Sequence, residues 1–96
     1  MPDVPTMRQS VLDEAGSIIA GDRQQTYGNV AESFARTALV WSGILGVTVT
    51  ATQVAQCMVG IKLTRLSASP THHDSWVDIA GYAALGREVA QESVIF

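Results

Sequence analysis

The sequence predicts an all-α protein, a four-helix up-and-down bundle, from three observations. Apolar residues recur at three- and four-residue intervals in four segments, at about 7–20, 30–45, 51–66 and 74–92. Short segments with glycine or proline separate them. The one stretch that alternates like a strand, Val47 to Val49, is too short to build a sheet. Ninety-six residues make one small domain, which we place at 6–96 behind a loose leader at 1–5.

The first two helices have clear apolar stripes and glycine stops. Thr6 can cap the helix at about 7–20, and Gly21 ends it. In the segment 30–45, Phe34 and Trp41 belong to one continuous apolar stripe, and Gly46 follows the last helical residue. Both segments therefore read as amphipathic helices that turn one face to a core.

The last two helices are joined by a short connection that contains Pro70. Thr50 and Gln53 have the spacing of a capping box before the helix at 51–66. That helix is apolar nearly all round, so we expect it to be central and expect Cys57 on it to be buried. The fourth helix is smooth because it holds several alanines and glycines, Gly86 among them. Such a surface favours tight helix contact.

Composition and charge restrict the function classes. The chain is 47% hydrophobic and only 16% charged, against about 25% charged in an average soluble domain. We therefore expect a homo-oligomer that buries part of this apolar surface. The net charge is −3, with no cluster of basic residues, which argues against binding to duplex nucleic acid. A single cysteine cannot form an internal disulfide.

A membrane location is the less favoured alternative. Residues 37–61 carry no charge and are long enough to cross a bilayer. Glycines at 43 and 46 and a threonine-rich run at 48–52 interrupt this stretch, and no signal peptide is visible at the start of the chain. We expect a cytoplasmic protein without a membrane contact.

The residues that can carry chemistry are concentrated at 62–82. Lys62 and Arg65 share one face of the third helix, because they are three residues apart. Asp74, Asp78 and Tyr82 are spaced by four and form one stripe on the fourth helix. Antiparallel packing of the two helices would bring the basic pair near the acidic pair. The pattern fits either a buried salt-bridge network or a site for a phosphorylated ligand.

Several short patterns resemble a family of small, uncharacterised proteins from tailed phages and prophages. They are D-R-x-x-x-Y-G-N at 22–29, K-L-x-R-L at 62–66 and H-x-D-S-W-V-D-I-A-G-Y at 72–82. The resemblance covers residues 10–92. More distantly, the layout is similar to all-α nucleoside triphosphate pyrophosphohydrolases of the MazG kind and to small phage proteins that sequester nucleotide signals. The resemblance implies action in the cytoplasm of the infected host cell.

The favoured function is nucleotide binding without chemistry and without a cofactor. Such a protein would sequester a nucleotide-derived immune signal of the host, such as a cyclic nucleotide or an ADP-ribose derivative. Arginine and lysine can hold phosphates, aromatic side chains can stack on a base, and a glycine allows close approach of the backbone. The candidate ligand-binding residues are Arg23, Tyr27, Gly28, Lys62, Arg65, Asp74, Trp76, Asp78 and Tyr82.

Two alternatives remain open. A Mg²⁺-dependent pyrophosphohydrolase needs about four carboxylates on one or two metal ions, and the chain offers Asp22, Glu32, Asp74 and Asp78 for this role. However, the paired E-x-x-E of the MazG pattern is missing. The other alternative is a structural helical oligomer that binds a protein partner, in which the charged side chains form salt bridges between helices. For His72 and His73 we expect a surface or helix-capping role rather than a metal site.

Overall fold

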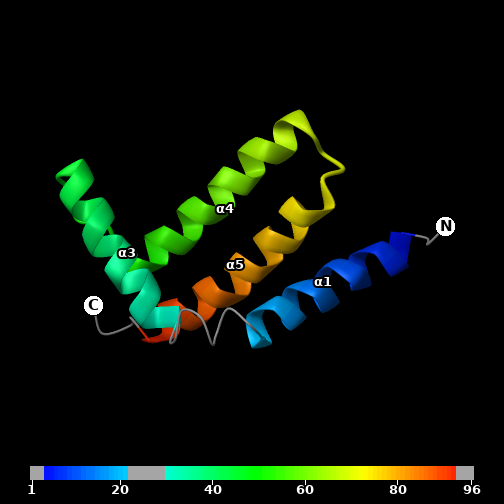
Figure 1. Ribbon diagram of the computed structural model, residues 1–96, viewed down its shortest axis with the longest axis horizontal. Helices are drawn as coiled ribbons and strands as arrows, with labels where there is room; N and C mark the ends of the chain where they lie inside the picture. Colours follow the sequence, from blue (N-terminus) through cyan, green and yellow to red (C-terminus); the bar gives the residue numbers. More distant parts are fainter. Residues whose placement is uncertain (1–3, 22–29, 93–96) are drawn as a thin grey trace.

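The computed structural model describes residues 4–21 and 30–92, and this part of the chain is built almost entirely from helices, with no strand (Figure 1). The helices are α1 (Val4–Ala20), α3 (Val30–Leu45), α4 (Ala51–Ala68) and α5 (His73–Glu92). The predicted all-α bundle of four helices is confirmed.

The helix boundaries differ from the expected ones by three residues or fewer. The helix α3 has the predicted ends, α4 is two residues longer at its end, and α5 begins one residue earlier. The helix α1 begins at Val4 instead of residue 7, although Pro5 lies in its first turn. A proline is tolerated there because the first N–H groups of a helix have no partner within the helix.

Helices α4 and α5 form an antiparallel pair that is the centre of the fold (Figure 1). Lys62 of α4 contacts Asp78 of α5, and Ala55, two turns earlier in α4, faces Gly86, two turns later in α5. The helix α1 packs on the other side of α5 and runs in the same direction. Two contacts show this direction: Glu14 meets His73, and further along both helices Ile19 lies close to Gly81.

The helix α3 crosses the α4–α5 pair at the end where α4 begins, and its C-terminal half extends beyond that pair (Figure 1). The connection from α3 to α4 turns at Gly46, whose φ of +71° lies in the left-handed region that favours glycine. The hydroxyl of Ser42 accepts the N–H of Val49 at 2.8 Å. This bond ties the connection back to α3 and fixes the direction of the projecting half.

Side chains close the starts of α4 and α5. The predicted capping box is confirmed, because the Thr50 hydroxyl accepts the N–H of Gln53 while the Gln53 amide oxygen accepts the N–H of Thr50. At α5, Nδ1 of His72 accepts the N–H of Ser75 at 3.2 Å and lies 2.8 Å from its hydroxyl. His72 is thus a cap, as expected, and Ser75 is 1% exposed beneath it.

Small side chains form the core of the described residues. Apart from one leucine, the buried apolar side chains are alanine or valine: Ala15, Ala38, Val54, Ala55, Leu66, Val77 and Val89. The radius of gyration is 14.7 Å, compared with about 12.5 Å for a compact chain of this length. The expectation that Cys57 is buried is wrong, because α4 turns this residue to solvent. An apolar sequence around a residue does not decide which side of the helix meets a partner.

None of the helices in residues 4–21 and 30–92 combines the length and the apolar character needed to cross a bilayer.

Gly60 of α4 and Gly86 of α5 predict opposite effects of alanine. A Cβ at Gly86 would lie 3.0 Å from the Cβ of Ala55, whereas a Cβ at Gly60 would meet no atom within 4 Å. We expect Gly60→Ala to stabilise the protein by roughly 0.5–1 kcal/mol through helix propensity. Gly86→Ala should instead destabilise it by about 1 kcal/mol, because α4 and α5 must move apart. Urea unfolding followed by circular dichroism measures both free energies.

A third variant controls for the location of the strain. Combining Gly86→Ala with Ala55→Gly removes the facing methyl group, so this pair should be more stable than Gly86→Ala alone. If Gly86→Ala stabilises the protein as much as Gly60→Ala does, the close approach of the two helices is not a constraint on the fold.

Candidate functional site

The candidate site is built around an ion pair between α4 and α5. The ammonium of Lys62 lies 3.0 Å from a carboxylate oxygen of Asp78, and the two side chains are 22% and 23% exposed. The spacing along each helix had predicted that a basic and an acidic group would meet here. The pair is partly screened from water, and each charge neutralises the other.

Lys62, Arg65, Asp74 and Asp78 form the charged quartet that the spacing predicted. Its other two members, Arg65 and Asp74, lie nearer to solvent. Arg65 is exposed and forms no ion pair with any residue in the described ranges. Asp74 is exposed in the first turn of α5, where a carboxylate interacts favourably with the helix dipole. The quartet is therefore one interhelical pair with two solvated neighbours, and does not form a closed network.

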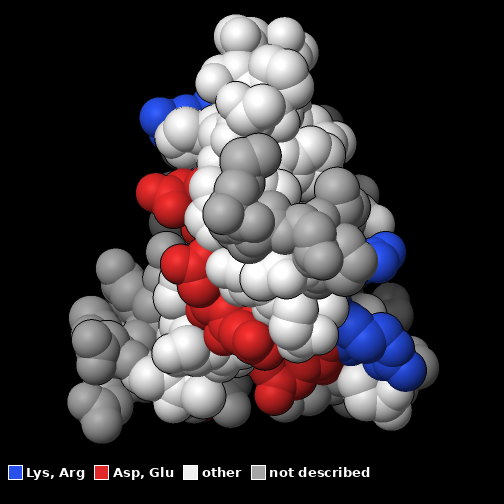
Figure 2. Space-filling model, turned by 90° about the vertical axis from the view of Figure 1, so that its right-hand side faces the viewer, with Lys and Arg blue, Asp and Glu red and all other residues white. Residues whose placement is uncertain are grey.

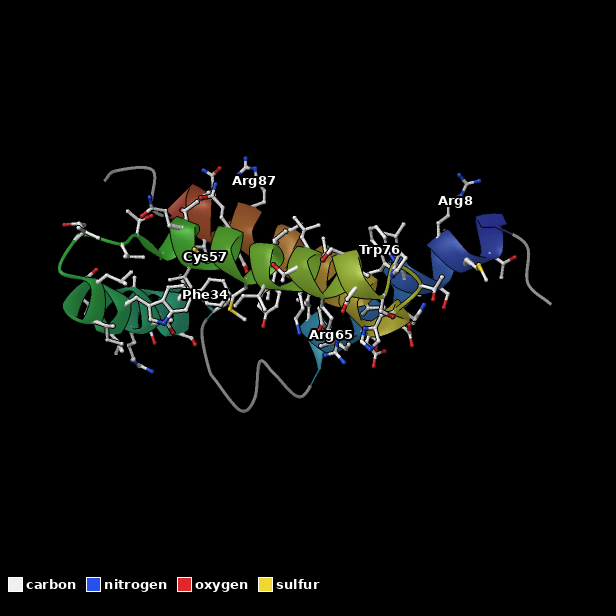
Figure 3. All side chains as sticks on the ribbon, turned by 90° about the horizontal axis from the view of Figure 1, so that it is seen from above. Arg8, Phe34, Cys57, Arg65, Trp76 and Arg87 are labelled. Carbon is white, nitrogen blue, oxygen red and sulfur yellow. The ribbon has the colours of Figure 1, made fainter. Side chains whose placement is uncertain are left out.

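The two aromatic candidates on α5 already have partners within the fold. Tyr82 packs on Phe34 of α3, with ring centroids 6.5 Å apart and planes inclined by 35°. The indole N–H of Trp76 donates to the carbonyl of Pro70 at 2.8 Å, and thereby closes the α4–α5 connection. The ring of Trp76 is still 46% exposed. Figure 3 shows Trp76 and Arg65 on opposite sides of the α4 ribbon, so they do not face a common ligand.

A second polar contact joins α1 to α5 close to the α4–α5 connection. The imidazole Nε2 of His73 contacts a carboxylate oxygen of Glu14, 59 residues earlier in the chain. The contact places the acidic residues of α1 beside Asp74, and Figure 2 shows a band of acidic side chains on this end of the molecule. Its negative charge disfavours phosphate unless a cation accompanies the phosphate.

Four residues of the predicted site lie outside the described residues: Asp22, Arg23, Tyr27 and Gly28. The nucleotide-binding hypothesis and the hydrolase alternative therefore each lack part of their residue set in the structure. Within residues 4–21 and 30–92, no three histidine, cysteine, aspartate or glutamate side chains are grouped as metal ligands. Glu32 lies on α3 near Arg36, at 3.8 Å in an exposed ion pair.

The sequence reasoning did not identify an apolar surface on the projecting half of α3. All five large apolar residues of this surface are more than half exposed: Leu39, Val40, Ile44, Leu45 and Val47. We call them the α3 tip surface. The sequence feature that marks this surface is the uncharged run at 37–61. We interpreted this run above as a possible membrane span and not as a protein interface.

Comparison with known proteins gives this chain a family but no activity. A family model described as "Domain of unknown function (DUF6378)" matches residues 10–90. The chain is 36% identical over 88 residues to the Gene 55 protein of Mycobacterium phage D29, which is 92% of this chain and 58% of the relative. It is 40% identical over 77 residues to the Gene 55 protein of Mycobacterium phage L5. These aligned residues make up 79% of this chain and 49% of the relative.

The chain thus spans about half the length of the curated relatives it matches. No solved structure is significantly similar to it. The predicted resemblance to an uncharacterised phage protein family is confirmed, while the more distant similarity to MazG-like enzymes stays a prediction. Because the family model covers most of the sequence, the chain belongs to the DUF6378 family, and its relatives are mycobacteriophage proteins.

Proposed function

We propose that this chain is a small helical interaction protein, which acts by binding protein surfaces in the cytoplasm of the infected cell and catalyses no reaction. The observation that carries the proposal is where apolar side chains of different size lie: small ones are buried, and large ones are exposed. Alanine and valine dominate the buried positions, while leucines, isoleucines and a tryptophan lie on the surface of several helices. Fully burying one such large side chain contributes roughly 1.5–3 kcal/mol, so these surfaces can supply binding free energy.

The use of charge supports the same proposal. Lys62 and Asp78 bind each other across α4 and α5, and Glu14 contacts His73 across α1 and α5. The ionisable side chains that lie between helices therefore hold the helices together. The band of acidic side chains in Figure 2 is a solvated surface unless a cationic partner meets it.

Nucleotide binding is the second candidate, and one observation favours it. Arg65 lies one helical turn after Lys62, is exposed, and has no ion-pair partner among the described residues. A guanidinium of this kind can bind a phosphate through two parallel hydrogen bonds. In this case the protein would sequester a nucleotide-derived immune signal of the host, and Lys62 would exchange Asp78 for the phosphate. A Mg²⁺-dependent hydrolase would additionally need Asp22 beside Asp74 and Asp78.

The interhelical ion pair gives the first test. Asp78→Ala leaves the Lys62 ammonium partly buried without its partner, so we expect a loss of about 2 kcal/mol in the free energy of unfolding. The double variant Lys62→Met/Asp78→Leu replaces both charges by apolar groups of similar size and should recover most of this loss. Urea unfolding measures both variants, with Asp74→Ala as the matched control on the same helix face. Unchanged stability of Asp78→Ala would contradict a structural role of the pair.

A nucleotide screen gives the second test. Thermal unfolding of the intact chain should not shift with nucleoside triphosphates, cyclic oligonucleotides or ADP-ribose derivatives, with or without Mg²⁺. Saturation at 100 times Kd would stabilise the folded state by about 2.7 kcal/mol, which shifts Tm by several degrees. A shift that Arg65→Ala abolishes, while Tm of the free protein is unchanged, would overturn the proposed function in favour of the second candidate. Release of pyrophosphate that Asp78→Asn stops would favour the hydrolase instead.

A further inference from the structure

Beyond the exposed Glu32–Arg36 ion pair, the C-terminal half of α3 is apolar both on its inner side and away from it. Its inner side carries Phe34 against Tyr82 and the buried Ala38, and Trp41 continues the same stripe. At 100° per residue, Leu39 and Val40 lie on the outer side, and Ile44 lies on the flank between Val40 and Trp41. Leu39 and Ile44 are each 75% exposed, the highest values among the large apolar residues of the described chain. A helix that is apolar all round is normally buried all round, so the outer side needs a cover.

The helices of the same chain do not supply this cover. The helix α3 packs on α4 and, less extensively, on α5, and it forms no packing contact with α1. Its C-terminal half extends past the pair, so Leu45 is exposed even though it lies on the inner stripe (Figure 1). The bond between Ser42 and Val49 holds the connection in place beside this half. The α3 tip surface is therefore a preformed, projecting apolar surface.

We propose that a second copy of this chain covers the α3 tip surface, which makes the protein a homodimer joined through α3. This inference rests on the proposed function and names the partner of one binding surface. The charge distribution favours a copy over an oppositely charged partner: between Arg36 and Lys62 the chain carries no charged residue. Two such surfaces can therefore face each other without desolvating a charge.

The position of the acidic residues favours the same partner. The chain has a net charge of −3, so two copies repel each other unless their acidic regions stay apart. The acidic band crosses the side of the molecule that faces the viewer in Figure 2, and α3 projects on the opposite side (Figures 1 and 2). Contact through α3 places the two acidic ends on opposite sides of the dimer, where salt screens their repulsion.

The shape of the surface also fits a two-fold contact. Gly43 lies between Leu39 and Ile44 on the outer side, and a Cβ there would meet no atom of the chain within 4 Å. In a two-fold arrangement the same patch serves both copies, so the two α3 helices can approach closely at Gly43.

Sedimentation equilibrium of the intact chain tests the inference. The wild-type mass should be twice the 10.2 kDa of one chain. Leu39→Lys/Ile44→Lys should raise the dimer dissociation constant at least ~100-fold, because it places charges inside the contact. Lysine is a good helix former and both sites are exposed, so Tm of the monomer should not fall. The control Leu12→Lys/Leu63→Lys changes two leucines on α1 and α4 that are also more than half exposed, and it should stay dimeric.

A charge-rescue experiment separates self-association from other causes of the loss. Leu39→Glu/Ile44→Glu should also be monomeric, and an equal mixture with the lysine variant should sediment as a dimer. Gly43→Cys in a Cys57→Ser background should form a disulfide-linked dimer on oxidation. A monomeric wild-type chain, equal loss in the control, or a mixture that stays monomeric would each overturn the inference. After any of these results the proposed function still stands, with a different protein as the partner. Nucleotide binding through Arg65, or pyrophosphate release that Asp78→Asn stops, overturns the proposed function itself.

Discussion

The close approach of α4 to α5 at Ala55 and Gly86 is the constraint on which the rest of the structure depends. Because Gly86 has no side chain opposite Ala55, α4 and α5 can pack closely along their length and bring Lys62 to Asp78. The helix α1 then uses the free side of α5 and runs parallel to it. Since α1 and α4 occupy different sides of α5, α3 crosses over one end of the pair. Its C-terminal half therefore extends beyond the bundle.

This arrangement explains why the apolar content of the chain does not appear in its core. Tight crossings favour alanine, valine and glycine, so the interior holds little of the leucine and isoleucine that the sequence supplies. The larger side chains remain on outer helix faces, with the greatest exposure on the projecting half of α3. Within the described residues no helix covers this surface, because each has already used its inner face, and the second copy that we propose would cover it.

The elements and the central ion pair could be predicted from the sequence, because local signals determine them. The Thr50–Gln53 capping box and the apolar spacing marked the ends of α4, and the spacing of Lys62 and Asp78 anticipated their meeting. Contacts between distant segments could not be predicted: nothing in the sequence links Glu14 to His73. The exposure of Cys57 and Leu45 could not be predicted either. Hydrophobicity indicates which residues can be buried, but it does not indicate where the partner helix ends. Three of the nine candidate ligand-binding residues, Arg23, Tyr27 and Gly28, lie at 22–29, outside the described chain.

Hydrogen–deuterium exchange at increasing protein concentration tests most directly whether the chain works through association of its exposed helix faces. We expect the amides of residues 39–45 to become more protected as the protein is concentrated, while those of α1 keep their exchange rates, because only α3 gains a partner. We expect no change at 62–65 when nucleotides are added. Exchange at 39–45 that is independent of concentration, together with nucleotide-induced protection at 62–65, would contradict both expectations and assign the function to the charged residues of α4 and α5.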